Sequence, residues 1–389
     1  MEVISMSIYL DNAATTQVCP EAAAAALDAM TAVYGNPSSP HRMGREAWAL
    51  LARSRETVAR ALGCAPGELY FTSCGSESDN WAVMQGAAYN ARHGKHIISS
   101  QVEHSAVLKS LDALERQGQF TVTRLKPETD GSVSVAAVLD ALREDTCLVT
   151  LMAVNNETGA VTDIAGIAKA VKARNPGTLV HTDAVQAFLK VPLHAGTLGA
   201  DLISVSGHKV HAPKGIAALY VRSGLNLPPL IHGGEQEGGR RAGTEPLPLI
   251  AAFAAAVEAA KADAAAPERM RLLRAHAAER LQIENPGLLL PGGTENAAPQ
   301  ILSISLPGWR SEVLMNALEA KEIYVSKSSA CKKGGRSYVL EAIGLPTAVI
   351  DGAIRVSLSR FTTEAEIDAF CGALRAAREA VRPSARRPR

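Results

Sequence analysis

At residues 202–209 the chain reads LISVSGHK, an apolar run with strand character that ends in a glycine, a histidine and a lysine. The same arrangement occurs upstream, where the apolar run 178–182 is followed by Asp183 and Gln186. Such runs alternate with helical stretches rich in Ala, Leu, Arg and Glu through the first half of the chain. This alternation predicts an α/β fold in which a mostly parallel sheet is covered by helices on both faces.

Polar residues cluster just after the expected strands. In sheets of this kind, ligands bind at the carboxyl ends of the strands, so we expect the functional site there. The expected strands are 68–72, 96–99, 120–125, 147–154, 178–182 and 202–206. The expected helices are 21–33, 45–62, 78–91, 105–117 and 163–174.

The character of the sequence changes after Arg222. A Pro/Gly-rich stretch at 223–248 leads into an Ala-rich segment, and 249–281 is long enough for one helix that bridges two domains. Beyond it we expect strands at 300–306, 323–327 and 354–358 and helices at 311–320 and from Thr363. We therefore predict a large α/β domain at 15–250, a smaller α+β domain made of 1–14 and 251–381, and a disordered tail at 382–389.

The composition is typical of a globular protein in a reducing compartment. Hydrophobic residues make up 47% and charged residues 20% of the chain, which excludes wholesale disorder. The formal net charge is +1 and no charge-free apolar run approaches the roughly 18 residues of a membrane span, so we expect neither nucleic acid nor a membrane as partner. The six cysteines are scattered without a C-x-x-C pair, which indicates reduced thiols in the cytoplasm and neither a disulfide framework nor a metal site.

Three features that follow strands offer chemistry that a hydrophobic core does not need. Lys209 is costly to bury as a charge and could form a Schiff base at lowered pKa, although alone it could equally be a surface lysine. Asp183 needs a cationic partner, such as a protonated pyridine nitrogen, unless it caps the next short helix. Gly75 and Ser76 precede a helix and offer backbone amides to a phosphate, although ordinary helix caps look alike.

Three further side chains have both a functional and a structural interpretation. His104 could stack on an aromatic ligand or move a proton, or it could be a satisfied loop residue. Arg355, in a short apolar strand, could grip a carboxylate or form a structural salt bridge. Cys331 precedes Lys332 and Lys333, whose charges would lower the pKa of its thiol. The remaining cysteines, in apolar, helical or loop contexts, are interpreted as small residues: Cys19, Cys64, Cys74, Cys147 and Cys371.

Together these residues predict one ligand. A lysine for an aldehyde, an aspartate for a ring nitrogen, a phosphate site and a stacking histidine describe pyridoxal 5′-phosphate (PLP). An arginine for an amino-acid carboxylate and a loop thiol complete the set.

Several strings of residues, spread over nearly the whole chain, carry a family resemblance. They are YLDNAATT at 9–16, GNPSS at 35–39, FTSCGSESDN at 71–80, VEH at 102–104, NNETG at 155–159, HTDAVQ at 181–186, SVSGHK at 204–209, RAGT at 241–244 and RVSLSRF at 355–361. In this order they resemble the cysteine desulfurases of the NifS/IscS kind, in the class V branch of the aminotransferase superfamily. The resemblance implies the fold type I of PLP enzymes, with a large domain built on a mostly parallel seven-stranded sheet and a smaller α+β domain.

The resemblance also implies how the cofactor is held. Lys209 would bind PLP covalently, Asp183 would pair with the pyridinium nitrogen, Gln186 with the phenolic oxygen, and His104 would stack on the ring. The resemblance adds further cofactor contacts from Gly75, Ser76, Asn155, Ser206, His208 and, reaching across a homodimer to the partner's phosphate, Thr244.

The implied activity converts L-cysteine to L-alanine and leaves a persulfide on the nucleophile Cys331. Asn155, Arg355 and Asn36 would bind the substrate, Lys209 would take its α-proton, and His104 would move a proton near its thiol. The persulfide sulfur would pass to an acceptor, such as an iron–sulfur scaffold protein.

The chain departs from the family pattern at two places. Many relatives have small residues around the nucleophile, whereas here the basic run 332–336 follows it. That run could tune the thiol, select an acidic acceptor, or be a solvated loop. Cys74 stands where relatives usually have glycine, and we interpret it as a small-residue substitution rather than a second nucleophile.

Other functions remain to be weighed. A selenocysteine lyase would use the same residues, whereas a plain aminotransferase needs no thiol at Cys331. A sulfur-relay scaffold without catalysis is disfavoured by Lys209, Asp183 and His104. A nicotinamide dehydrogenase would need a G-x-G-x-x-G motif at a strand-to-helix junction, which the sequence lacks.

Overall fold

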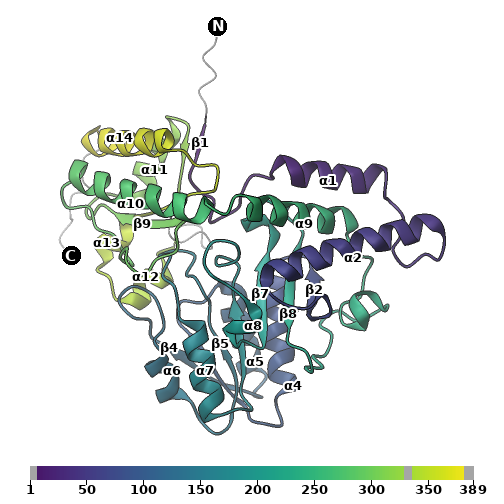
Figure 1. Ribbon diagram of the computed structural model, residues 1–389. Coiled ribbons are helices and arrows are strands. Elements are labelled where there is room, and N and C mark those ends of the chain that lie inside the picture. The colour runs from purple at the N-terminus through teal and green to yellow at the C-terminus, as the bar shows by residue number, and fades with distance from the viewer. Residues whose placement is uncertain (1–6, 328–334, 381–389) are drawn as a thin grey trace.

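Seven strands form the central sheet of the computed structural model, which describes residues 7–327 and 335–380 (Figure 1). Their order across the sheet is β2-β8-β7-β6-β5-β3-β4. The bounds are β2 (Leu69–Thr72), β3 (His96–Ser100), β4 (Thr121–Leu125), β5 (Thr146–Thr150), β6 (Leu179–Asp183), β7 (Leu202–Ser206) and β8 (Ala217–Val221). Neighbours pair in parallel except β8, which is antiparallel to both β2 and β7. The predicted mostly parallel α/β sheet is confirmed.

The strand β8 is the one central strand that the pattern of alternation does not predict. It returns antiparallel beside β7 without a crossover helix, so it interrupts the alternation of strand and helix on which the sequence interpretation rests. The resemblance to a seven-stranded family was the only indication of it.

Helices flank this sheet (Figure 1). Their bounds are α1 (Pro20–Thr31), α2 (Arg42–Leu62), α3 (Gly75–Asn80), α4 (Gly86–Tyr89), α5 (Ser105–Arg116), α6 (Val135–Ala141), α7 (Ile164–Arg174), α8 (Ala195–Leu198) and α9 (Leu247–Ala262). A π-helical segment, Trp81–Gln85, joins α3 to α4. The helix expected from residue 78 therefore begins at Gly75, and α6 and α8 were not expected.

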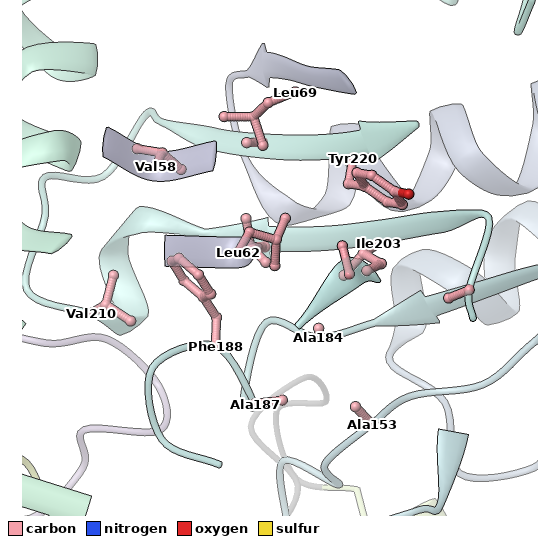
Figure 2. Packing of buried hydrophobic residues seen from close by; sticks show 14 of the residues in the cluster. Val58, Leu62, Leu69, Ala153, Ala184, Ala187, Phe188, Ile203, Val210 and Tyr220 are labelled. Atoms are coloured by element: carbon pink, nitrogen blue, oxygen red, sulfur yellow. The ribbon is translucent and has the colours of Figure 1, made fainter. Parts of the chain in front are cut away.

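Successive strand residues face opposite sides of the sheet, as the period of a β-strand requires. Leu202 and Leu219 pack into a cluster with the π-helical segment and α5. Their neighbours Ile203 and Tyr220 pack into a second cluster with α2, α7 and α9. Figure 2 shows this second cluster, in which side chains from α2 and Phe188 lie near the strands. Most positions of the central strands are buried, as expected for a sheet covered on both faces, although they include polar residues such as His96 and Ser204.

The C-terminal part of the chain forms smaller sheets with their own helices. Strands β11 (Ser326–Lys327), β12 (Ala353–Ser357) and β9 (Ile301–Ser305) form an antiparallel sheet, and β1 (Ile8–Tyr9) pairs in parallel with β10 (Ile323–Tyr324). The helices are α10 (Ala266–Glu284), α11 (Ser311–Glu319), α12 (Tyr338–Ile343), α13 (Thr347–Asp351) and α14 (Glu364–Ala380). A separate hydrophobic cluster joins Leu10 to residues of this part, such as Ile304 and Phe370. The domain boundaries proposed from the sequence stay a prediction.

Two expectations for this region are wrong. The single bridging helix is broken, because α9 ends at Ala262 and α10 begins at Ala266. Asp263 leaves the helical conformation (φ −96°, ψ 60°), and Pro267 occupies the first turn of α10, where a missing N–H is tolerated. The strand expected at 323–327 is also divided, since β10 pairs with β1 and β11 with β12. Among the described helices, none combines the length and apolar character that crossing a membrane requires.

Replacement of Phe188 tests the packing between the sheet and its helices. Its ring is 1% exposed and meets Phe253 of α9 edge to face, with ring centroids 6.3 Å apart. We expect Phe188→Ala to lower the free energy of unfolding by about 3–5 kcal/mol, because it leaves a cavity. The matched control Ile283→Ala, at a side chain 72% exposed, should change it by less than about 0.5 kcal/mol. Chemical unfolding followed by circular dichroism measures both, and equal effects would contradict the packing described.

Candidate active site

A cavity of about 340 Å³ lies at the carboxyl ends of the central strands. It is lined by Ala13, Ala14, Cys74, Gly75, Ser76, Asp79, His104, Met152, Val154, Asn156, Asp183, Val185, Gln186, Ser206, His208, Lys209 and Arg355. These residues come from the N-terminal segment, from the ends of β2, β3, β5, β6 and β7, and from β12 of the small sheet. The cavity therefore lies at the edge of the sheet where the sequence predicts a site.

Lys209 lies in a short 3-10 turn that directly follows β7. Its Nζ donates hydrogen bonds to the carbonyl oxygens of Ala13 and Ala14, both at 2.6 Å. The N-terminal segment is fastened to the same turn, since the backbone amide and the hydroxyl of Thr16 both donate to the carbonyl of His208. Residues nearly 200 positions apart therefore meet at the lysine.

Asp183 ends β6 and is buried in the cavity wall. Its Oδ1 accepts a hydrogen bond from the amide of Val185 at 2.9 Å. Burial raises the pKa of this carboxyl, while the nearby His104 and Lys209 act in the opposite direction. A buried carboxylate in this position is stabilised by a cation that enters the cavity.

Asp79, on α3, is a buried acid that the sequence analysis missed. Ligand-type atoms of Asp79, His104 and Asp183 all lie within 4.8 Å of one another. Burial, and next the charge of Asp183, raise the pKa of Asp79 well above its usual range. The cavity thus has two buried carboxyl groups on one side, with His104 beside them. His104 accepts the Ala106 amide on Nδ1 at 3.2 Å, so its neutral ring carries the proton on Nε2.

The start of α3 and the end of β7 contribute groups that suit an anion to the cavity wall. The N-cap residue Cys74 makes no side-chain cap, so the first amides of α3 remain available to an anion. The hydroxyl of Ser206 is buried and, among the described residues, has no hydrogen-bond partner. A Cβ on Gly75 would lie 3.0 Å from Cγ2 of Val185 and 3.6 Å from Cβ of Ser206, so any side chain there would fill this part of the cavity.

Burial also lowers the pKa of His208 to about 3, and Lys209 acts in the same direction. The ring of His208 is therefore neutral, and its Nδ1 lies 3.2 Å from the hydroxyl of Thr15.

Two long side chains that line the cavity each have a polar atom without a hydrogen-bond partner among the described residues. Gln186 donates to the carbonyl of Ala13 at 2.9 Å, while its Oε1 has no partner in the described part of the chain. Arg355 donates to Oδ1 of Asp11 at 2.9 Å and to the carbonyl of Asn156 at 2.8 Å. The Nε of Arg355 is buried without a partner among the described residues.

Among the described residues, three predicted site residues do not line the cavity. The side chain of Asn155 is engaged inside the chain, since its Nδ2 donates to the carbonyl of Val102 and its Oδ1 accepts the amides of Glu157 and Thr158. The next residue, Asn156, lines the cavity instead, and the Asn-Asn pair was the signal that pointed to it. The exposed residues Asn36 and Thr244 lie elsewhere, and Cys331 lies outside the described residues.

The five described cysteines are free thiols. Burial raises the pKa of Cys147 and Cys371 to about 12, which agrees with their interpretation as small hydrophobic residues. Cys74 is exposed and lines the cavity.

Residues 8–370 match the aminotransferase class-V family. Cysteine desulfurase 2 of Trichormus variabilis is 42% identical over 363 residues, covering 93% of this chain and 90% of that protein. Cysteine desulfurase IscS of Serratia proteamaculans is 42% identical over 373 residues, covering 94% and 91%. A solved NifS-like protein superposes with a TM-score of 0.91 at 37% identity, covering 97% and 100%. SspA in complex with cysteine has a TM-score of 0.80 at 33% identity, covering 92% and 100%.

The chain belongs to the aminotransferase class-V family, a family of PLP-dependent enzymes. Within it, the similarities group the chain with the cysteine desulfurases, and they do not favour the selenocysteine lyase interpretation.

The cavity fits PLP. Asp183 offers the carboxylate that a pyridinium nitrogen needs, and the unpartnered Oε1 of Gln186 is available beside it. The hydroxyl of Ser206 and the amides at the start of α3 suit a phosphate, and the cavity-lining Lys209 offers an amine that can react with an aldehyde.

Filling the phosphate end should weaken cofactor binding. We expect Gly75→Val to reduce PLP affinity by at least about tenfold, that is by more than about 1.4 kcal/mol, because the branched side chain occupies the space beside Ser206. The control is Gly67→Val, at an exposed position where a Cβ meets no atom within 4 Å. PLP titration of the cofactor-free proteins, followed by absorbance, measures both affinities. Equal affinities in the two variants would exclude this location for the phosphate.

Proposed function

We propose that this protein is a PLP-dependent cysteine desulfurase that converts L-cysteine to L-alanine and collects the sulfur as a persulfide on Cys331. The observation that carries the proposal is the meeting of Lys209, Asp183 and Arg355 in one cavity of a chain related to cysteine desulfurases. A relative of similar fold is in complex with cysteine, which supports this substrate.

In the proposed arrangement Lys209, Asp183 and Gln186 hold the cofactor ring, and His104 covers it. Gly75, Ser76, Ser206 and His208 hold its phosphate. When bound, PLP supplies an electron sink for bonds at the α-carbon of an amino acid. The low pKa of His208 keeps its ring neutral, so it serves as a hydrogen-bonding group rather than a second cation.

Arg355 is the proposed partner of the substrate carboxylate. Its buried Nε remains available for such an acceptor, while Asp11 and the carbonyl of Asn156 hold the guanidinium in place. Asn156 lines the same cavity, and its Oδ1 has no hydrogen-bond partner among the described residues, so we assign to Asn156 the contact that the resemblance gave to Asn155. The predicted substrate contact of Asn36 stays a prediction.

The proton and sulfur steps use three side chains. Lys209 accepts the α-proton of the substrate, and His104, protonated on Nε2, exchanges a proton near the substrate thiol. The Cys331 thiolate attacks the substrate sulfur, and the bond between that sulfur and the β-carbon breaks. The enzyme keeps a Cys331 persulfide, and the carbon skeleton takes up a proton and leaves as alanine.

The test is alanine and sulfide release from L-cysteine in the presence of a reductant. We expect Cys331→Ala to release both at least about a hundredfold more slowly than wild type, because the nucleophile is lost. The matched control is Cys74→Ala, which removes the exposed thiol that lines the cavity and should retain activity. Retained activity in Cys331→Ala, or lost activity in Cys74→Ala, would show that the nucleophile is assigned wrongly.

We further propose a homodimer in which Thr244 of each subunit contacts the phosphate bound in the other. Thr244 is exposed and does not line the cavity of its own chain. Large apolar side chains are also exposed on α1, on α2 and between them, namely Leu27, Met30, Tyr34 and Trp48. Exposed apolar groups of this size are typical of a surface that a partner covers.

Complementation between two defective variants tests this arrangement. If Thr244 acts across the dimer, a heterodimer of Lys209→Ala and Thr244→Val keeps one of its two sites intact. That site should bind PLP as wild type does, whereas the Thr244→Val homodimer should bind at least about tenfold more weakly, because a hydrogen bond to a charged phosphate is lost. The heterodimer is purified with two different affinity tags and titrated with PLP. A heterodimer that binds only as weakly as the Thr244→Val homodimer would place Thr244 at the site of its own subunit. A Thr244→Val homodimer that binds PLP as wild type does would place Thr244 away from the site.

The sulfur acceptor is proposed to be a protein such as an iron–sulfur scaffold. The support is the relationship to IscS proteins and the basic run 332–336, which suits an acidic partner. Most of that run lies outside the described residues, and its role stays a prediction, as does the cytoplasmic location.

A further inference from the structure

A second cavity, of about 380 Å³, adjoins the candidate active site. In the described part of the chain, Lys209 is the residue that lines both cavities. The second cavity forms where the segment after β6, the turn after β7 and the segment after β12 meet the break between α9 and α10. The break that the sequence did not predict therefore contributes to its wall.

Apolar side chains make up much of this wall. Val191 and Leu193 come from the segment after β6, Met270 from α10, and Leu358 from the segment after β12. The volume is within the range of about 300–1,000 Å³ that is typical of small-molecule sites. The aliphatic part of a ligand could therefore be buried against these apolar side chains.

The charged groups of the wall are mostly cations. Apart from Lys209, whose amine is proposed to bind PLP, the cations Lys190, Lys261 and Arg360 line the cavity together with the single acid Asp263. Asp263 is already neutralised, because Arg269 donates to its Oδ2 at 2.7 Å. The described lining therefore carries an excess of positive charge without a carboxylate free to balance it.

Lys190 is a partly buried cation of this wall, whereas Lys261 is exposed to solvent. Lys209 donates to two carbonyl oxygens, and Arg360 donates to the carbonyl of Ala259 and stacks on Phe361. The side chain of Lys190 is half-buried. Within residues 7–327 and 335–380, its Nζ makes no hydrogen bond or ion pair. Burial, and next the charge of Lys209, lower the pKa of Lys190 to about 7.

The backbone that presents Lys190 is also unusual. The preceding residue, Leu189, has a left-handed conformation with φ of 61°, which is unfavourable for a residue with a side chain. Such a conformation persists where the surrounding structure enforces it, often at a binding site.

We propose that this second cavity is a binding site for a small organic anion, a carboxylate with an aliphatic body, whose charged group is bound by Lys190. The carboxylate supplies the counter-charge that the wall lacks, and the aliphatic body contacts Val191, Leu193 and Met270. This site is separate from the one proposed for the cofactor and L-cysteine, and its ligand is not consumed.

Calorimetric titration of the purified holoenzyme with octanoate tests the proposal. Wild type should bind one octanoate per subunit in a saturable manner, and 1-octanol, which has the same body without the charge, should bind at least about tenfold more weakly. Lys190→Met keeps the length of the side chain and removes its charge, so it should also weaken octanoate binding by at least about tenfold. Lys190→Arg should retain binding.

Two further variants separate the site from non-specific effects. Lys169→Met, at an exposed position of α7, removes one positive charge elsewhere and should leave octanoate binding unchanged. Leu193→Trp fills the cavity while Lys190 is kept, and should abolish binding even if Lys190→Met fails to fold. The absence of saturable binding by wild type, or binding that both Lys190→Met and Leu193→Trp leave intact, would overturn the proposal. Binding is measured without turnover, so failure of the proposed desulfurase activity would be seen separately.

Discussion

The site depends on the contact between the amine of Lys209 and the carbonyl oxygens of Ala13 and Ala14. The same N-terminal segment accepts a hydrogen bond from Gln186 on the carbonyl of Ala13, and the amide of Ala13 donates one to the hydroxyl of Ser357, at the end of β12. Asp11, at its start, holds Arg355. One short segment therefore ties the ends of β6 and β7 to the small sheet, and it brings the proposed substrate arginine to the lysine.

Electrostatics makes this arrangement costly without a ligand. Asp183, Asp79 and Glu103 are buried close together, and burial raises the pKa of each, to about 8 for Glu103. An uncompensated group of acids is unfavourable in a protein interior, so a cation such as a pyridinium is stabilised beside them. The packing of the sheet places these acids at its carboxyl edge, where a positively charged ring would favour their ionised form.

The structure also explains which expectations were wrong or incomplete. The alternation of strand and helix does not predict β8 because β8 returns antiparallel, and the sequence 249–281 predicts one continuous helix because alanine favours a helix on both sides of the break. Asn155 and Asn156 are neighbours of the same type, so only the backbone decides which of them turns inward to hold a loop and which one lines the cavity. Asp79 has the sequence context of an ordinary polar helix residue, and only the assembled fold shows that it is buried beside Asp183.

By itself, the sequence determined the α/β class, the carboxyl-edge location of the site and most of its chemistry. These properties follow from local patterns: alternating apolar runs, and Lys209, Asp183 and Gly75 placed at strand and helix ends. Only the tertiary structure decided that Asp79 lies beside Asp183 and that a second, cationic cavity adjoins the first. Each of these depends on segments far apart in the chain, and long-range packing leaves no periodic signal in the sequence from which it could be predicted.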